Sequence, residues 1–224
     1  MNLPNGFGVI FDWDGVVIDS EKFHRRSWEA LQAEENLTME DGAFEISFGM
    51  RNEQIIPNVF KWAAPDDTAR IQALADRKES LYRELIRAEG IEPLPGVVTL
   101  LDELATAGVP TSVGSSTPRA NIDAVMDVIG VTDKFREVVA AGDVSYGKPN
   151  PEVFLTAASR LGCTPGNSVV IEDAQVGIQA GKAGGFNVLA VATTHAAEEL
   201  SAADVCYPNL ASVTLRTLLD LVNP

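Results

Sequence analysis

Four acidic residues of the chain follow short apolar segments that have the pattern of buried strands. They are Asp12, Asp14, Glu172 and Asp173. Carboxylates that are held close together repel one another, so a group that gathers them needs a cation. Oxygen ligands without histidine or cysteine select a hard ion, and Mg²⁺ fits best. The acidic residues therefore predict a magnesium site.

A lysine and a group of hydroxyls supply donors for a second, negatively charged ligand. Ser115, Ser116 and Thr117 follow another apolar segment, and Lys148 lies in the loop after a third. Mg²⁺, a lysine and hydroxyl donors together suit a phosphoryl group that is being transferred. One acid after a strand is typical of a helix cap or a turn, but several segment ends with matched charges are hard to explain as capping.

An open parallel sheet would bring these residues together. The predicted strands are Gly8–Phe11, Pro110–Gly114, Glu137–Ala141, Ser168–Glu172, Val188–Thr193 and Asp204–Tyr207. The predicted helices are Val97–Ala107, Pro118–Gly130, Glu152–Leu161, Gln175–Ala183 and Ser212–Val222. This alternation predicts an α/β fold, a doubly wound, Rossmann-like parallel sheet whose strand ends meet at one ligand-binding edge.

A long helical insertion interrupts the alternation after the first strand. Apolar residues recur there at helical spacing, with Asp66 and Asp67 placed to begin a helix and Gly90 to end it. Pro57 predicts that an earlier helix is bent or starts late. The expected domains are an α/β core, residues 1–20 and 95–224, and an all-α cap, residues 21–94.

Composition excludes several classes of partner. The 224 residues include 17 basic and 32 acidic side chains, a formal net charge of −15. Nucleic acids and anionic membranes repel such a chain, and it has no apolar run as long as a membrane span. Cys163 and Cys206 lack metal spacing and are expected to be reduced thiols. We expect a cytoplasmic monomer or weak dimer, without nucleic-acid or membrane partners, that binds a small phosphorylated metabolite.

Four motifs, in order, resemble those of the haloacid dehalogenase (HAD) superfamily of phosphotransferases. The segment Phe11–Ser20, FDWDGVVIDS, is similar to the first motif, and Ser115 matches the second. Lys148 in GKPNP matches the third, and Ile171–Ala174, IEDA, matches the fourth. The match covers nearly the whole chain. The helical insertion resembles the cap of the subgroup that contains β-phosphoglucomutase and sugar-phosphate phosphatases.

The resemblance implies a phosphoric monoester hydrolase that depends on Mg²⁺. Asp12 would be the nucleophile that forms an aspartyl-phosphate, and Asp14 would act as general acid and then as general base. Lys148 and Ser115 would hold the phosphate. Dehalogenases of the superfamily need no acid at the position of Asp14, so the resemblance favours phosphate-ester chemistry.

The same resemblance implies a set of metal ligands. Asp12, Asp173 and the backbone carbonyl of Asp14 would bind the ion, and Glu172 would bind it directly or through water. A receiver-like phospho-acceptor module without catalysis is a remote alternative, because such modules also combine acids, a hydroxyl and a lysine with Mg²⁺. The long helical insertion argues against that class.

The cap decides between a hydrolase and a mutase. His24 and Lys78 match the mutase-like pattern and are candidate substrate-binding residues, as are Arg51, Ser116 and Arg119. A mutase must hold a second phosphate while it excludes water.

Two departures from the mutase pattern favour hydrolysis of a sugar phosphate. Asn52 stands where the mutase has its phosphate-binding arginine, and Pro118 replaces a basic residue. The loop at residues 48–53, FGMRNE, and the segment Arg77–Glu79 also look similar to plant-type phosphatases of a phosphorylated riboflavin precursor. A β-phosphoglucomutase-type isomerase remains the alternative.

Three further residues have a structural interpretation. Trp13 and Trp62 are expected to be packing residues, and His195 is expected to be a solvated loop residue.

Overall fold

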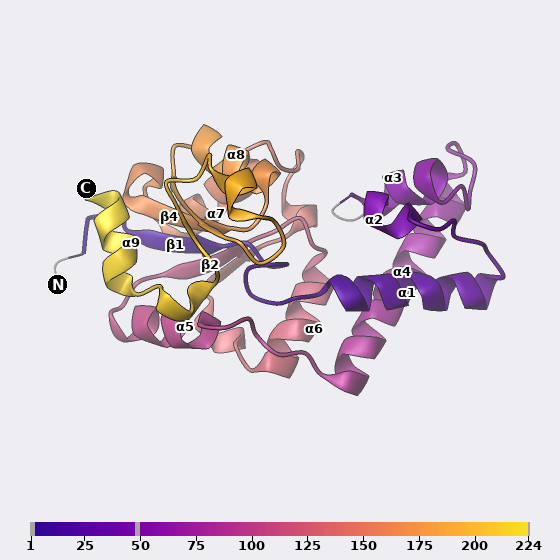
Figure 1. Cartoon of the computed structure of the whole chain (residues 1–224), viewed down its shortest axis with the longest axis horizontal. Coiled ribbons are helices and arrows are strands. Elements are labelled where there is room, and N and C mark those ends of the chain that lie inside the picture. The colour runs from indigo at the N-terminus through magenta and orange to yellow at the C-terminus, as the bar shows by residue number, and fades with distance from the viewer. Residues whose placement is uncertain (1–2, 48–49, 224) are drawn as a thin grey trace. The chain divides into compact units, whose positions relative to one another are not determined.

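A computed structural model describes residues 3–47 and 50–223, and in this part of the chain it contains one six-stranded sheet (Figure 1). The strands are β1 (Gly8–Phe11), β2 (Thr111–Gly114), β3 (Glu137–Val139), β4 (Ser168–Glu172), β5 (Asn187–Val191) and β6 (Val205–Tyr207). Their order is β3-β2-β1-β4-β5-β6, and all neighbours are parallel. The predicted doubly wound α/β fold is confirmed.

Helices cover both faces of this sheet (Figure 1). They are α5 (Val97–Thr106), α6 (Arg119–Ile129), α7 (Glu152–Leu161), α8 (Gln175–Ala183) and α9 (Leu215–Val222). α7 and α8 pack on one face, where Phe154 and Ala180 join Ile10 and Val170 in a fully buried cluster. Central strands that are covered on both faces have to be apolar throughout, and β1 and β4 are buried along their whole length.

The chain forms two compact units. The first comprises Met1–Asp19 and Ile91–Pro224, and the second comprises Ser20–Gly90. The second unit contains α1 (Glu21–Glu35), α2 (Ala43–Ser47), α3 (Asn52–Gln54), a π-helical turn (Ile55–Val59) and α4 (Thr68–Glu89). Within the described residues it contains no strand, as expected of an all-α insertion.

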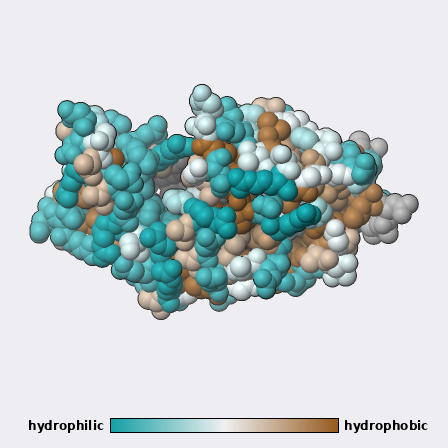
Figure 2. Space-filling view, turned by 180° about the vertical axis from the view of Figure 1, so that it is seen from behind, coloured by the Kyte–Doolittle hydropathy of each residue, from teal (hydrophilic) through white to brown (hydrophobic). Residues whose placement is uncertain are grey.

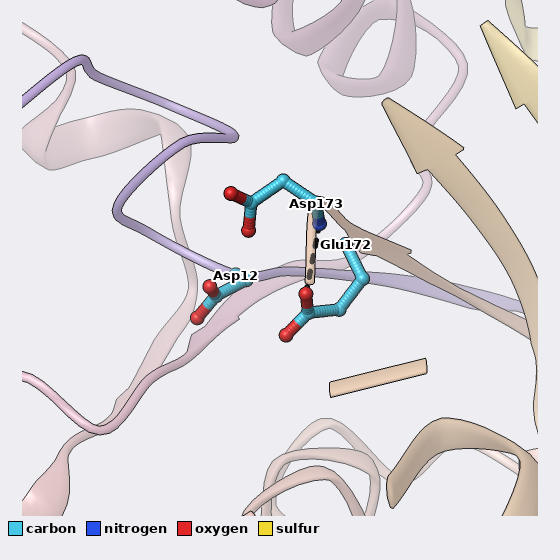
Figure 3. A group of neighbouring side chains, drawn as sticks. All are labelled: Asp12, Glu172 and Asp173. Carbon is cyan, nitrogen blue, oxygen red and sulfur yellow. Dashed lines mark hydrogen bonds between the residues drawn. The ribbon is translucent and has the colours of Figure 1, made fainter. Parts of the chain in front are cut away.

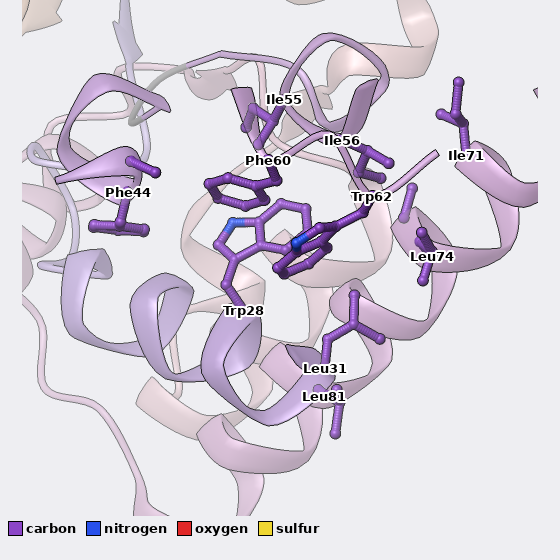
Figure 4. Close-up of a cluster of buried hydrophobic side chains, with 12 residues drawn as sticks. Trp28, Leu31, Phe44, Ile55, Ile56, Phe60, Trp62, Ile71, Leu74 and Leu81 are labelled. Atoms are coloured by element: carbon purple, nitrogen blue, oxygen red, sulfur yellow. The ribbon is translucent and has the colours of Figure 1, made fainter. Parts of the chain in front are cut away.

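Aromatic packing between α1 and the segment after the π-helical turn stabilises the second unit (Figure 4). The Trp28 ring meets those of Phe60 and Trp62 at centroid distances of 5.0 and 5.7 Å. The indole nitrogen of Trp62 donates a hydrogen bond to the Thr38 carbonyl at 2.8 Å, so its burial leaves no polar group without a partner. Trp62 is a packing residue, as predicted, and Trp13 is fully buried in the first unit.

The ends of α4 follow from its sequence. Asp67 is the N-cap residue, and its carboxylate accepts a hydrogen bond from the backbone N–H of Arg70 at 3.0 Å. Gly90 ends the helix with φ +76°, a conformation that other residues rarely adopt. Both ends agree with the prediction from sequence.

The surface is largely hydrophilic, with apolar residues scattered over it on the face that Figure 2 shows. Among the described residues, no helix is both long enough and apolar enough to cross a membrane. Cys163 and Cys206 are free thiols, as expected.

Candidate active site

The strand order reverses around β1, which lies between β2 and β4. In open parallel sheets, ligands bind beyond the carboxyl ends of the strands at this point. The backbone continues the ladder for one residue past β1, because the Asp12 N–H donates to the Ile171 carbonyl at 2.9 Å. Asp12 therefore leaves the sheet beside the end of β4, where Glu172 and Asp173 stand.

Three buried carboxylates meet at this edge (Figure 3). Asp12, Glu172 and Asp173 each offer an oxygen, and these oxygens lie within 4.8 Å of one another. In Figure 3 the three side chains turn toward a common space. One small cation can contact oxygens at this spacing, and a set of oxygen donors alone suits Mg²⁺.

The protonation behaviour of the cluster also fits a cation. Burial, together with the Glu172 charge, raises the pKa of Asp12 from 3.8 to about 7, although Lys148 opposes the shift. Burial, with Glu172 and Asp12, raises the pKa of Asp173 from 3.8 to about 8. Both carboxylates are thus costly to ionise even beside Lys148, and a divalent cation would supply further positive charge. The residues present fit the metal ion that the sequence predicts.

Magnesium is expected to change how stability depends on pH. Without metal, the folded state takes up protons at Asp12 and Asp173 below pH values of about 7 and 8, which the unfolded chain does only near 3.8. The stability of the metal-free protein therefore rises as the pH falls from 8 to 6. In EDTA, we expect the Tm at pH 6 to be about 5 °C higher than the Tm at pH 8. At pH 8, Mg²⁺ at a hundred times its Kd should raise the Tm by about 5–10 °C.

Calorimetric unfolding at the two pH values, with EDTA or with Mg²⁺, measures both effects. Asp173→Asn is the informative variant, because it removes one titrating carboxylate from the cluster. A variant that keeps the full pH dependence and the full response to Mg²⁺ would contradict the expected cluster.

Glu172 is held by three donors. One of its carboxylate oxygens accepts hydrogen bonds from the backbone N–H groups of Asp173 and Ala174, both at 2.8 Å. Its other oxygen accepts from Lys148 Nζ at 2.6 Å. Gly177, at the start of α8, leaves space for this carboxylate, because a Cβ atom at residue 177 would overlap it. The glycine at residue 177 therefore has a steric reason.

Lys148 contacts two of the three acids. Its Nζ lies 2.7 Å from Asp12 Oδ1 and 2.6 Å from Glu172 Oε1, and only 7% of its side chain is exposed. Burial works against the ammonium form, but Asp12 and Glu172 raise the pKa of Lys148 above its ordinary value. The lysine therefore stays charged and can hold an anion beside Asp12.

Asp14 takes a different position from the other acids. Its carboxylate accepts a hydrogen bond from the Thr117 hydroxyl, and the backbone N–H of Thr117 donates to Ser115 Oγ at 3.0 Å. Gly15 follows with φ +79°, which turns the chain away from β1. Asp14 is half-buried, whereas Asp12 and Asp173 are buried, so it has better access to water.

The first unit brings some predicted residues together and leaves others apart. Asp12, Glu172, Asp173 and Lys148 form one cluster. Ser115 is buried at the end of β2. Ser116 and Arg119 are exposed, and the Arg119 guanidinium pairs with Asp123 one helical turn along at 2.7 Å.

Three residues that were not predicted as site residues lie near the cluster: Thr117, Thr194 and His195. Thr117 belongs to the hydroxyl group after β2, so a signal was present. Thr194 donates to the Asp173 carboxylate, and His195 contacts the Asp173 backbone carbonyl. No motif marks Thr194 or His195. His195 is an exposed loop residue, as expected, and it makes these contacts as well.

The second unit contains a polar network around a buried lysine. Lys78 Nζ lies 2.8 Å from His24 Nδ1 and 2.9 Å from Glu79 Oε1, and the same oxygen accepts from Asn52 at 2.7 Å. The His24 ring stacks on Tyr82 at a centroid distance of 4.4 Å. Burial opposes ionisation of Glu79, but Lys78 and His24 hold its pKa below the ordinary value. Lys78 thus has a negative neighbour.

The loop that precedes this network is described only in part. Phe48 and Gly49 lie outside the described residues. The Arg51 side chain is exposed, and Arg51 is the N-cap residue of α3.

Comparison with known proteins identifies the family. The profile of the haloacid dehalogenase-like hydrolases matches residues 8–185. A chloroplastic 5-amino-6-(5-phospho-D-ribitylamino)uracil phosphatase of Arabidopsis thaliana is 31% identical over 220 residues, which are 96% of this chain and 58% of that longer protein. Fructose-1-phosphate phosphatase YqaB of Escherichia coli is 32% identical over 82% of this chain and 95% of its own length.

A solved structure supports the same fold. β-Phosphoglucomutase from Clostridium difficile has a TM-score of 0.81 and 24% identity, with 96% of each chain covered. The chain belongs to the haloacid dehalogenase-like hydrolase family. It is an enzyme of the phosphoric monoester hydrolase class, to which phosphatases of this family belong.

Proposed function

We propose that the chain is a Mg²⁺-dependent phosphatase that hydrolyses a small phosphorylated metabolite, a sugar phosphate, through an aspartyl-phosphate intermediate. The contact that carries the proposal is the ion pair of Asp12 and Lys148 at 2.7 Å, next to Glu172 and Asp173. This arrangement holds a carboxylate nucleophile beside a fixed positive charge. The sugar-phosphate class draws support from relatives such as the fructose-1-phosphate phosphatase.

The proposed reaction has two displacements at phosphorus. Asp12 attacks the phosphorus atom, and the bond to the ester oxygen breaks while Asp14 gives that oxygen a proton. Asp14 then takes a proton from water, which attacks the phosphorus and releases Asp12 and phosphate. Lys148 and Ser115 bind phosphoryl oxygens in both steps. Mg²⁺, held by Asp12, Asp173, the Asp14 backbone carbonyl and, directly or through water, Glu172, would neutralise developing charge.

The network of the second unit favours a hydrolase over a mutase. A mutase has to bind a second phosphate, which needs a concentrated positive charge. Lys78 has the Glu79 carboxylate 2.9 Å away, and Asn52 donates to that same carboxylate. The negative charge of Glu79 repels a second phosphate, whereas hydroxyls of a sugar can exchange hydrogen bonds with both residues. We propose that His24 and Lys78 recognise that part of the substrate.

Lys78→Ala is expected to change substrate preference more than chemistry. The ratio of kcat/KM for a sugar phosphate over p-nitrophenyl phosphate should fall about tenfold, a loss of about 1.4 kcal/mol in binding the sugar. Because Lys78 is buried beside Glu79, the double variant Lys78→Ala, Glu79→Gln keeps the charge balance. Lys22→Ala, on the exposed side of α1, is the control. An equal loss on both substrates would contradict a role in recognition.

A panel of phosphorylated metabolites tests the proposed function. With Mg²⁺, at least one sugar phosphate should release phosphate with kcat/KM of about 10⁴ M⁻¹s⁻¹ or more, and EDTA should stop the release. A stable phosphoprotein without turnover of p-nitrophenyl phosphate would instead indicate the phospho-acceptor class.

The alternative is a β-phosphoglucomutase-type isomerase, whose sequence pattern His24 and Lys78 match. β-Glucose 1-phosphate with a trace of the bisphosphate separates the two. Glucose 6-phosphate without free phosphate would overturn the hydrolase proposal.

We further propose that the enzyme works in the cytoplasm as a monomer or weak dimer. The free thiols Cys163 and Cys206 support a reducing compartment.

A further inference from the structure

The loop after β5 contacts Asp173, one of the three acids of the cluster. The Thr194 hydroxyl donates a hydrogen bond to Asp173 Oδ2. His195 Nδ1 lies 2.9 Å from Thr194 Oγ1 and 3.1 Å from the backbone carbonyl oxygen of Asp173. Three residues from two loops thus form a closed chain of polar contacts around Asp173.

The donors and acceptors of this chain are consistent with one another. A threonine hydroxyl has a single hydrogen, and here it is given to the Asp173 carboxylate. Thr194 Oγ1 must then accept from His195, so His195 Nδ1 carries a hydrogen. The Asp173 carbonyl can only accept, and it requires the same hydrogen on Nδ1. Both contacts of His195 therefore select one tautomer.

Gly15 also lies close to the Asp173 carboxylate. A Cβ atom at Gly15 would overlap the Asp173 carboxylate and would lie 2.9 Å from Thr194 Cγ2. The loop after β5 also contacts the segment after β1, because Thr193 donates a hydrogen bond to the Gly15 carbonyl. Asp173 is buried, with 5% of the residue exposed, and the orientation of its side chain is set by Gly15 and Thr194.

We propose that Thr194 is a positioning residue that holds the Asp173 carboxylate in the orientation needed to bind Mg²⁺, with His195 orienting the Thr194 hydroxyl. The inference rests on the proposed Mg²⁺ site. It adds to that site two residues that do not contact the ion. Loss of such an outer hydrogen-bond partner weakens metal affinity by about 10–100-fold in other sites.

Titration calorimetry with Mg²⁺ alone, without substrate, tests the proposal. Thr194→Val keeps the shape of the side chain and removes the hydroxyl, so its Kd for Mg²⁺ should rise about 10–100-fold. Thr194→Ser keeps the hydroxyl and should stay within about threefold of the wild-type Kd. His195→Ala should show a smaller increase than Thr194→Val. Thr106→Val, the same substitution at an exposed site on α5, should bind as the wild type does.

The outcomes separate this inference from the proposed function. Wild-type protein that binds Mg²⁺ and releases phosphate, with a Thr194→Val variant of equal affinity, would overturn the positioning role alone. A wild-type protein that binds no Mg²⁺ would overturn the proposed function and the inference together. Far-UV circular dichroism of the metal-free variants establishes that they are folded. At saturating Mg²⁺, the kcat of Thr194→Val should approach the wild-type value. A substitution at a residue that contacts the substrate would not be rescued in this way.

Discussion

Asp12→Asn is expected to lower kcat by about 10⁴-fold or more on every phosphate ester. The amide keeps the size of the side chain but removes the nucleophile, and loss of a covalent nucleophile has effects of this order. Lys148 keeps Glu172 as a partner at 2.6 Å, so the substitution does not leave an unpaired buried charge. Steady-state release of phosphate measures the loss.

The matched control is Asp220→Asn on α9, where the carboxylate forms a surface pair with Arg216. Its kcat should equal the wild-type value, since surface pairs contribute little. Acid-quenched wild-type enzyme should also carry phosphate on an aspartate during turnover, and the Asp12→Asn variant should carry none. Near-full activity of Asp12→Asn would assign the nucleophile to another residue.

Asp14→Asn should have an effect that depends on the leaving group. A sugar alkoxide needs a proton as it departs, so kcat should fall about 10²–10⁴-fold on a sugar phosphate. p-Nitrophenolate departs without protonation, so the first step on p-nitrophenyl phosphate should be nearly unaffected. Burst kinetics should show rapid release of the phenol followed by slow hydrolysis of the phosphoenzyme, because the second step still needs a base.

In Asp14→Asn, the side-chain amide oxygen can still accept a hydrogen bond from Thr117, so we expect the local geometry to be retained. Thr117→Val separates geometry from proton transfer, because it removes the hydroxyl and keeps the acid. Equal losses for Asp14→Asn in the rate of the first step on both esters would contradict the role of general acid and indicate a role in folding or metal binding.

The sequence predicts the elements of the sheet well where burial is continuous. The bounds predicted for Ser168–Glu172, Glu152–Leu161 and Gln175–Ala183 agree with β4, α7 and α8. These segments have an uninterrupted apolar or amphipathic pattern, and turn residues such as Gly162 follow them. Local chemistry alone decides such boundaries.

Boundaries that depend on tertiary contacts were less predictable. The last helix begins at Leu215 and not at Ser212, because Leu210–Ser212 forms a separate turn and Thr214 is the N-cap. The strand predicted over Val188–Thr193 ends at Val191, which frees Thr193 to bond Gly15. Pro118 precedes α6 as its N-cap residue and does not lie in its first turn.

Pro57 shows how much the rule that proline disrupts a helix can predict. Its missing N–H predicts a defect in the helix, and α3 passes into a π-helical turn at Ile55–Val59. The rule predicts a defect but not its form. In the same way, the ordered motifs predict the acidic cluster, whereas Thr194 and His195 reach it only through the return of the chain after β5. That contact depends on the register of β4 and β5, which the sequence pattern does not specify.

The placement of β1 has a consequence for synthesis of the protein. Val9 pairs with Thr111 and with Val169, so the earliest strand acquires its neighbours late. A growing polypeptide can assemble the helical insertion from contacts among residues 20–90 while the first strand still lacks both neighbours. On the proposed mechanism, catalytic competence requires Asp173 and therefore arises only after β4 has left the ribosome. A chain that ends before Asp173 should then release no phosphate from a phosphate ester.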